Sequence, residues 1–228
     1  HLAIKMPAED YLISGISNAL RLANFSDDNS VAKDIVSSGA GGRGYGRPFA
    51  ATPSVFFGVF AATLPPIEWY RDGIETGMCK TRLASNSAMA GLKTLNRLEQ
   101  VLARSEFYNT DVFEGLTMDG ADNIICGTMS NLFIVNDGKL STPSLASCGV
   151  EGVMRRHLIE TLMGQGIPTD IQAIRLADMN NSDEIFISNS QFGVLPVRRC
   201  VAAQWPVGET TKMVMAILAD AGVAECRL

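Results

Sequence analysis

The spacing of apolar residues constrains the fold of this chain most, because it fixes the order of strands and helices. Strand-like apolar runs come in clusters, and stretches with an apolar residue at every third or fourth position lie between the clusters. Strict alternation of strand and helix would instead predict a doubly wound parallel sheet. The observed order favours an α+β fold.

We expect helices at residues 8–22, within 90–106, at 151–164 and at 209–221, and strands at 53–62, 112–119, 124–135, 184–190 and 194–198. The strand at 53–62 is expected to be buried. The Asp137-Gly138 pair predicts a turn that leads into one further short strand.

A turn-rich stretch at residues 63–73, TLPPIEWYRDG, is the candidate domain boundary, with Pro65-Pro66 as the strongest break. A chain of 228 residues is long enough for one large domain or two modest ones with their own cores. We therefore predict a small N-terminal α/β domain at residues 1–66 and a larger domain at 67–228.

Charge and composition exclude several classes of function. The net charge is −5 and the 19 Lys and Arg residues are scattered, so no nucleic-acid partner is expected. No apolar run reaches the roughly 18 residues that cross a bilayer, and HLAIKMPAED has no signal-peptide pattern, so we expect no membrane association and a cytoplasmic location. Five widely spaced cysteines without a C-x-x-C pair, and two histidines, predict neither a disulfide framework nor a metal site.

Lys93 stands where an amphipathic helix is predicted to begin, in the stretch AGLKTLNRLEQVLARSE. The apolar face of this helix is formed by Leu92, Leu95, Leu98, Val101 and Leu102. A helix N-terminus repels cations, and an amine near apolar surface loses its proton more easily. Such a lysine can form a Schiff base with an aldehyde, although most lysines at helix starts are solvated and have no chemical role.

The glycine-rich stretch GAGGRG at residues 39–44 matches the G-x-G-x-x-G pattern of dinucleotide-binding loops. The residues that follow, Tyr45-Gly46-Arg47-Pro48, cannot open the helix that this mechanism requires, which excludes the nucleotide interpretation. Two interpretations stay open. Arg43 and Tyr45 bind a carboxylate, or the stretch is an ordinary surface loop.

Three further stretches carry candidate binding groups. In CGVEGVMRR, a loop feeds a helix, so the amides of Val153 and Met154 either hold a phosphate or simply begin the helix. ISNSQFG at residues 187–193 ends a strand with small polar residues, which suit an anion or a turn. CGTMSNLFIV places Thr128, Ser130 and Asn131 in an otherwise apolar strand, where their polar groups need partners.

Five blocks follow one another along the chain: GLKTLNRLEQVLARSE, EGLTMD, GTMSNLFIV with NDGKLSTP, CGVEGVMRRHLIE and DEIFISNSQFGVLPVR. In this order they resemble the fold-type IV pyridoxal-phosphate enzymes, the class IV aminotransferase family, and the likeness covers nearly the whole chain. Within that family, LKTLNRLEQVLAR, SNSQFGVLPVR and GGRGYG are most similar to the lyase members.

The resemblance implies a site for pyridoxal 5′-phosphate. The implied cofactor-binding residues are Lys93, Arg97, Cys126, Asn131, Val153, Met154 and Ser190. The phosphate is implied to lie against the amides of Val153 and Met154 and the Ser190 hydroxyl, with Asn131 and Arg97 around the ring.

The resemblance also implies a reaction. Lys93 would be the catalytic residue, which forms the Schiff base, and Arg43 and Tyr45 would fix a substrate carboxylate. The implied activity is conversion of 4-amino-4-deoxychorismate to 4-aminobenzoate and pyruvate in folate biosynthesis. The implied fold is a small α/β domain followed by a larger barrel-like domain, in a homodimer.

The chain departs from the family pattern at identifiable positions. Its first residue is expected to match an internal block of the family, so the N-terminal strands of the small domain are expected to be missing. Ile4 replaces an arginine that grips the phosphate, and Thr94 replaces a histidine. Cys126 replaces the glutamate that pairs with the pyridine nitrogen, and a thiol cannot stabilise a pyridinium as a carboxylate does. An aminotransferase of D- or branched-chain amino acids and a degenerate, non-catalytic relative therefore stay open as alternatives.

Overall fold

The computed structural model describes residues 3–23, 30–46 and 51–226. The chain divides into two compact units, His1–Leu64 and Pro65–Leu228. The sequence prediction placed the boundary after residue 66. Among the described residues, no helix is both long enough and apolar enough to span a bilayer.

The first unit is one helix on a two-stranded antiparallel sheet. It contains α1 (Glu9–Ala23), β1 (Ser30–Ser37) and β2 (Ser54–Ala61), with Ser30 paired to Ala61. The ring of Phe57 packs against α1 at Gly15, where a side chain would overlap it. The prediction of a buried strand at 53–62 is wrong, because α1 contacts only one face of so small a sheet. On the other face, Phe56 and Phe60 are 62% and 55% exposed.

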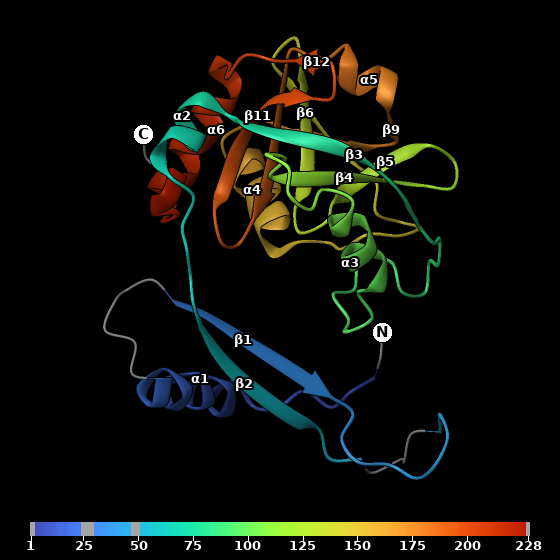
Figure 1. The fold of residues 1–228 in the computed structure, drawn as a ribbon. Helices are drawn as coiled ribbons and strands as arrows, with labels where there is room; N and C mark the ends of the chain where they lie inside the picture. The colour runs from blue at the N-terminus through green and yellow to red at the C-terminus, as the bar shows by residue number, and fades with distance from the viewer. Residues whose placement is uncertain (1–2, 24–29, 47–50, 227–228) are drawn as a thin grey trace. The chain divides into compact units, whose positions relative to one another are not determined.

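The second unit is built on one mixed sheet of ten strands (Figure 1). Its elements are α2 (Ile67–Asp72), β3 (Ile74–Leu83), α3 (Leu98–Ser105), β4 (Glu114–Asp119), β5 (Asn123–Gly127), β6 (Asn131–Asn136), β7 (Lys139–Pro143), α4 (Val153–Gly164), β8 (Thr169–Gln172), β9 (Ile174–Arg175), α5 (Leu176–Asn180), β10 (Glu184–Asn189), β11 (Gly193–Cys200), β12 (Ala203–Gln204), α6 (Glu209–Asp220) and the 3-10 helix η1 (Ala224–Cys226). The strand order is β8-β7-β6-β10-β11-β3-β4-β5-β9, and β12 pairs with β11.

The sheet curls into a nearly closed, barrel-like form, because β5 also contacts β6 and β7. Strands β11, β3 and β4 run parallel to one another, whereas β6, β10 and β11 are antiparallel neighbours. Helices α4 and α6 pack against each other and against β10, and α3 packs on β3 and β4. The main core includes the stacked rings of Phe133 and Phe186, whose centroids are 4.9 Å apart. Helices and strands thus share one core, which confirms the α+β prediction.

Two predicted elements differ from the structure for local reasons. The expected strand at 124–135 is two strands, because residues 127–130 form a tight turn between β5 and β6. Strand β3 was missed, since its sequence, IETGMCKTRL, has no clean alternation of apolar and polar residues. It is nonetheless a central strand, flanked on both sides by β11 and β4.

Candidate active site

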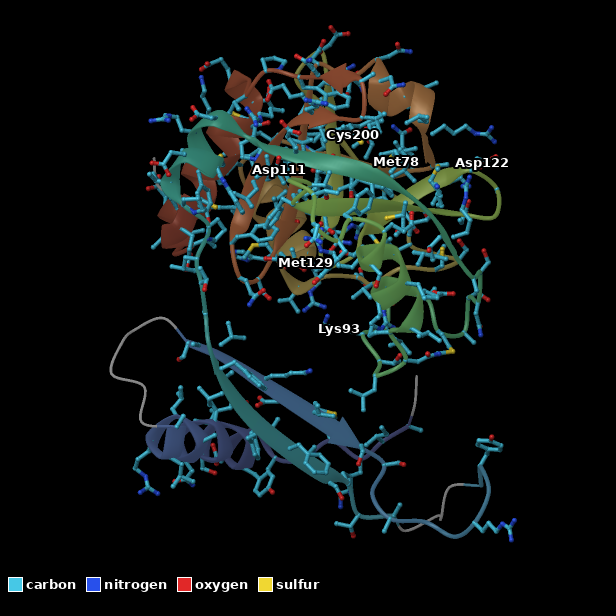
Figure 2. The ribbon with its side chains drawn as sticks, in the orientation of Figure 1. Met78, Lys93, Asp111, Asp122, Met129 and Cys200 are labelled. Atoms are coloured by element: carbon cyan, nitrogen blue, oxygen red, sulfur yellow. The ribbon has the colours of Figure 1, made fainter. Side chains whose placement is uncertain are left out.

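Lys93 lies in an irregular, non-helical segment, residues 91–97, and its side chain is exposed (Figure 2). Lys93 was predicted to stand at a helix start with its side chain directed toward the protein. This prediction is wrong, because α3 begins at Leu98 and the side chain is exposed. Gly91 has a φ of +79° and pairs with a distant loop: its amide donates to Gly149 and its carbonyl accepts from Glu151. These bonds replace the helical ones, so the helix-dipole argument does not apply to Lys93.

Arg97, at the end of this segment, folds back onto the residues on either side of Lys93. Its Nε donates to the Thr94 carbonyl at 3.0 Å, and its Nη2 donates to the Leu92 carbonyl at 3.3 Å and to Thr94 Oγ1 at 3.1 Å. Arg97 and Lys93 thus lie within one segment. Its predicted contact with a cofactor ring stays a prediction.

The apolar face of α3 was expected to face the protein core, and this expectation is wrong. Ala103 is the buried residue of the helix, since α3 packs on β3 and β4 through its other face. The side chains of Leu95, Leu98, Val101 and Leu102 are 69%, 64%, 58% and 53% exposed, respectively. We call these four residues the α3 stripe.

Asn131 holds the loop that leads into α4. It is 5% exposed, its Nδ2 donates to the Val150 carbonyl at 2.9 Å, and its Oδ1 accepts from the Gly152 amide at 3.2 Å. Gly152 is required there, since a Cβ would lie 2.2 Å from Asn131 Oδ1. No side chain caps α4. The amides of Val153 and Met154 at the helix start can therefore donate hydrogen bonds to a bound anion.

Ser190 lies in the turn between β10 and β11, and its side chain is exposed. Asn189 shapes this turn, because its Oδ1 accepts from the amides of Gln191 and Phe192. The Phe192 carbonyl accepts from the Tyr70 hydroxyl at 3.1 Å. The turn therefore presents the Ser190 hydroxyl to solvent on a fixed backbone.

The turn connects to the Asn131 site through the strand register. In β10, Ser188 pairs directly with Asn131 of β6, so the two side chains lie on one face of the sheet. The Asn189 side chain also donates to the Met129 carbonyl at 3.3 Å. The Ser190 turn, the Asn131 loop and the turn at residues 127–130 are thus neighbours.

Glu114 is a site residue that the sequence analysis missed. Its buried carboxylate accepts five hydrogen bonds, from the Gly115 amide, the Thr128 amide and hydroxyl, the Met129 amide and the Ser130 hydroxyl, at 2.5 to 3.1 Å. The polar side chains of Thr128 and Ser130, which were expected to need partners, thus find one in the Glu114 carboxylate. A glutamate near the start of a predicted strand, where a buried carboxylate needs partners, was the available signal.

Cys126 is 4% exposed and packs with Leu83, Ile125, Leu145 and Cys148. Burial raises the pKa of its thiol to about 11, although hydrogen bonds with the Thr117 hydroxyl and the Val150 backbone oppose this rise. The thiol is therefore neutral near pH 7. Its predicted place opposite a pyridine nitrogen stays a prediction.

The residues of the second unit suit a phosphate-bearing aldehyde. An exposed primary amine is available at Lys93, uncapped amides lie at the start of α4, and an exposed hydroxyl lies at Ser190. The segment of Lys93 is hydrogen-bonded to the loop before α4, and Asn131 holds the same loop. Among the described residues, no group of three or more His, Cys, Asp or Glu is arranged to hold a metal ion.

Three predicted residues lie in the first unit. Arg43 and Tyr45 are exposed in the loop between β1 and β2, and Ile4 lies before α1. The structure therefore leaves the substrate role of Arg43 and Tyr45 a prediction.

Comparisons with known proteins agree with this chemistry. Residues 3–200 match the sequence profile of class IV amino-transferases. The chain is 36% identical over 194 residues to an aminodeoxychorismate lyase of Vibrio harveyi, which covers 83% of this chain and 72% of the relative.

Solved structures give the same picture. The crystal structure of 4-amino-4-deoxychorismate lyase from Pseudomonas aeruginosa superposes with a TM-score of 0.82 at 39% identity, covering 95% of this chain and 79% of that one. A branched-chain amino acid aminotransferase from Escherichia coli superposes with a TM-score of 0.72 at 25% identity, covering 94% and 70%.

Proposed function

The chain belongs to the class IV aminotransferase family, whose members depend on pyridoxal 5′-phosphate, and on that basis we propose that it is a lyase of folate biosynthesis that converts 4-amino-4-deoxychorismate to 4-aminobenzoate and pyruvate. The observation that carries the proposal is the similarity to lyases at 36% and 39% identity over most of the chain. The predicted cytoplasmic location stays a prediction.

The residues of the second unit have distinct roles in this proposal. The amides of Val153 and Met154 and the Ser190 hydroxyl hold the cofactor phosphate. When bound, the cofactor withdraws electrons from the carbon that carries the substrate amine. Lys93 Nζ would hold the cofactor aldehyde in the resting protein and would accept the proton from C4 of the substrate during the reaction.

The proton transfer completes the reaction. The electrons of the C4–H bond form a ring double bond, the C3–O bond breaks, and enolpyruvate leaves with the oxygen and tautomerises to pyruvate. The ring becomes aromatic, which drives the reaction forward. Arg43 and Tyr45 bind a substrate carboxylate through a charge-assisted pair and a phenolic hydroxyl.

The test of the Lys93 assignment is reductive trapping. Borohydride added to the cofactor-loaded protein should fix the cofactor on Lys93, which peptide mapping by mass spectrometry will locate. Lys80 is the matched control, because it is an exposed lysine of β3 in the same unit. A label on Lys80, or cofactor bound without any label, would contradict the assignment.

The second candidate function is aminotransfer, which the similarity to the E. coli branched-chain enzyme supports. The two functions differ in their need for an amino acceptor. Release of pyruvate and 4-aminobenzoate from 4-amino-4-deoxychorismate alone supports the lyase, whereas activity that depends on 2-oxoglutarate supports the aminotransferase. A chain that binds pyridoxal phosphate and does neither is the degenerate relative.

The α3 stripe supports a homodimer as part of the proposal. Four large apolar side chains exposed on one helix face and its flank are unusual for a surface that meets only water. A groove of about 570 Å³ continues this surface toward the 127–130 turn; it is lined by Gln100, Val101, Arg104, Ser105, Phe107, Tyr108, Asn109, Thr110, Thr128 and Met129. A second copy of the chain would cover both.

Association is testable by sedimentation velocity on a charged variant. Leu98→Asp with Leu102→Asp should shift the protein toward monomer, because each carboxylate would be buried in the interface. Leu22→Asp is the matched control, since Leu22 is 76% exposed in the first unit and outside the stripe. A double variant that sediments like the unmodified chain would remove the stripe from the interface.

A further inference from the structure

The side chain of Arg97 forms hydrogen bonds to the residues on both sides of Lys93. Its guanidinium donates to the carbonyls of Leu92 and Thr94, which flank Lys93, and to the Thr94 hydroxyl. Three bonds from one fork-shaped group fix the backbone on both sides of Lys93 at once.

The position of Arg97 adds a second reason to look for a role. Arg97 is the residue that immediately precedes the first turn of α3. A cation at a helix N-terminus is unfavourable, because the unpaired amides there carry partial positive charge. A residue whose side chain accepts a hydrogen bond from the first amides, such as Ser or Asp, is preferred at this place, and Arg97 makes no side-chain cap.

The other end of the Lys93 segment is fixed independently. Gly91 forms an isolated parallel bridge with Val150, through the Gly91 amide to Gly149 and the Glu151 amide to the Gly91 carbonyl. The Val150 carbonyl is held in turn by Asn131. The segment is therefore tied at Gly91 to the loop before α4 and closed at its other end by Arg97.

We propose that Arg97 is a positioning residue, which holds the Lys93 backbone so that the amine reaches a cofactor bound at the start of α4. This inference rests on the proposed function for the role of Lys93, but the restraint on the segment is independent of it. Loss of Arg97 would leave the anion site at Val153 and Met154 intact. It would impair the covalent link at Lys93.

The experiment compares two forms of the cofactor. Pyridoxal phosphate can link to Lys93, whereas pyridoxamine phosphate has no aldehyde and binds through its phosphate and ring alone. In Arg97→Met, we expect affinity for pyridoxal phosphate to fall about tenfold, the effect of one charged hydrogen bond of about 1.4 kcal/mol. Affinity for pyridoxamine phosphate should be unchanged.

Two further variants make the comparison specific. Arg97→Lys should recover part of the lost affinity, because an ammonium reaches one of the two carbonyls. Arg104→Met is the matched control, since Arg104 lies on the same helix and donates to one remote carbonyl, that of Val112. Equal losses for both cofactor forms would show that Arg97 contacts the ring or supports the fold, and would overturn the inference.

A cofactor-free measurement separates this inference from the proposed function. The Leu92 amide donates to the Met89 carbonyl, and Arg97 holds the carbonyl of the same residue, Leu92, so hydrogen exchange at Leu92 reports on the part of the segment that Arg97 restrains. Exchange at Leu92 should accelerate about tenfold in Arg97→Met, which is the same free energy expressed as a rate, and should stay unchanged in Arg104→Met. The Gly91 amide, which donates to Gly149, is the internal control, because its bond does not involve Arg97. Unchanged exchange in Arg97→Met would overturn the inference even if the protein binds pyridoxal phosphate. Failure of the unmodified chain to bind either cofactor form would instead reject the proposed function.

Discussion

Asn131 offers the sharpest test of how the α4 loop is held. Substitution Asn131→Leu keeps the side-chain volume and removes both of its bonds, to the Val150 carbonyl and the Gly152 amide. An unpaired buried group costs about 1–3 kcal/mol. The two backbone groups are half-buried, so water replaces part of the loss. We therefore expect about 1 kcal/mol for each group, the low end of that range, and about 2 kcal/mol in total.

Urea unfolding followed by circular dichroism measures this change directly. Asn131→Asp is the matched variant, because it keeps the acceptor for Gly152 and places an oxygen against the Val150 carbonyl. A protonated carboxyl regains the donor, so its pKa should be higher in the folded protein than in the unfolded chain. The penalty should then shrink as pH falls toward about 4, the usual pKa of Asp.

The reasoning has two ways to fail. An Asn131→Leu variant as stable as the unmodified chain would mean that the loop does not depend on these bonds. An Asn131→Asp variant with a pH-independent penalty would mean that the side-chain oxygen does not face Val150. Gly152→Ala provides an independent check, because its Cβ would overlap Asn131 Oδ1 and should displace the same loop.

Three further predictions concern the cofactor site and the thiols. Ser190→Ala should weaken pyridoxal phosphate binding by roughly 1–3 kcal/mol, the cost of losing a hydrogen bond to a charged group, whereas Gln191→Ala in the same turn should leave it unchanged. If equilibrium dialysis gives Ser190→Ala the same affinity as the unmodified chain, the phosphate binds elsewhere. Cys126→Glu should raise lyase turnover about tenfold, a gain of about 1.4 kcal/mol in transition-state stabilisation. The same substitution should lower the stability of the cofactor-free protein, because it buries a carboxylate. Background rates of both lyase and aminotransferase activity for this variant, in a complete, cofactor-bound chain, would argue for the degenerate relative. Burial raises the pKa of all five cysteine thiols, to about 11 for Cys126. Above about pH 9 the folded protein therefore binds more protons than the unfolded chain, so its free energy of unfolding should fall as pH rises further. A melting temperature that does not change between about pH 8 and 10 would contradict this prediction.

The fold was predictable where apolar spacing is regular. Helix α6 and strand β10 begin at the predicted residue, and each buries apolar side chains in the core. Strand β3 was not predictable in the same way. It is buried by neighbours that lie far away in sequence, and a parallel central strand need not alternate in polarity.

The candidate site was likewise predictable only where the local sequence determines the structure. The uncapped start of α4 was predictable, because glycine spacing before a helix is a local property of the sequence. The conformation of the Lys93 segment was not, because Gly91 pairs with a loop nearly sixty residues away. The leucine spacing after Lys93 was interpreted as a core-facing helix, although an apolar face can equally be exposed. Glu114 was overlooked, since its five donors lie mostly beyond the next strand.

The hydrogen bonds of Val150 explain why the residue at position 126 matters beyond its charge. The Val150 backbone contacts the Cys126 thiol, its carbonyl is held by Asn131, and its neighbours Gly149 and Glu151 bond to Gly91. A side chain at position 126 therefore touches the same loop that places both the amides at the start of α4, which are proposed to bind the phosphate, and the Lys93 segment. A thiol can accept the Val150 bond while staying neutral in an apolar cluster, which a carboxylate does only at a desolvation cost. The cysteine thus favours the integrity of the cofactor-free site, whereas a glutamate would favour the chemistry of the bound cofactor.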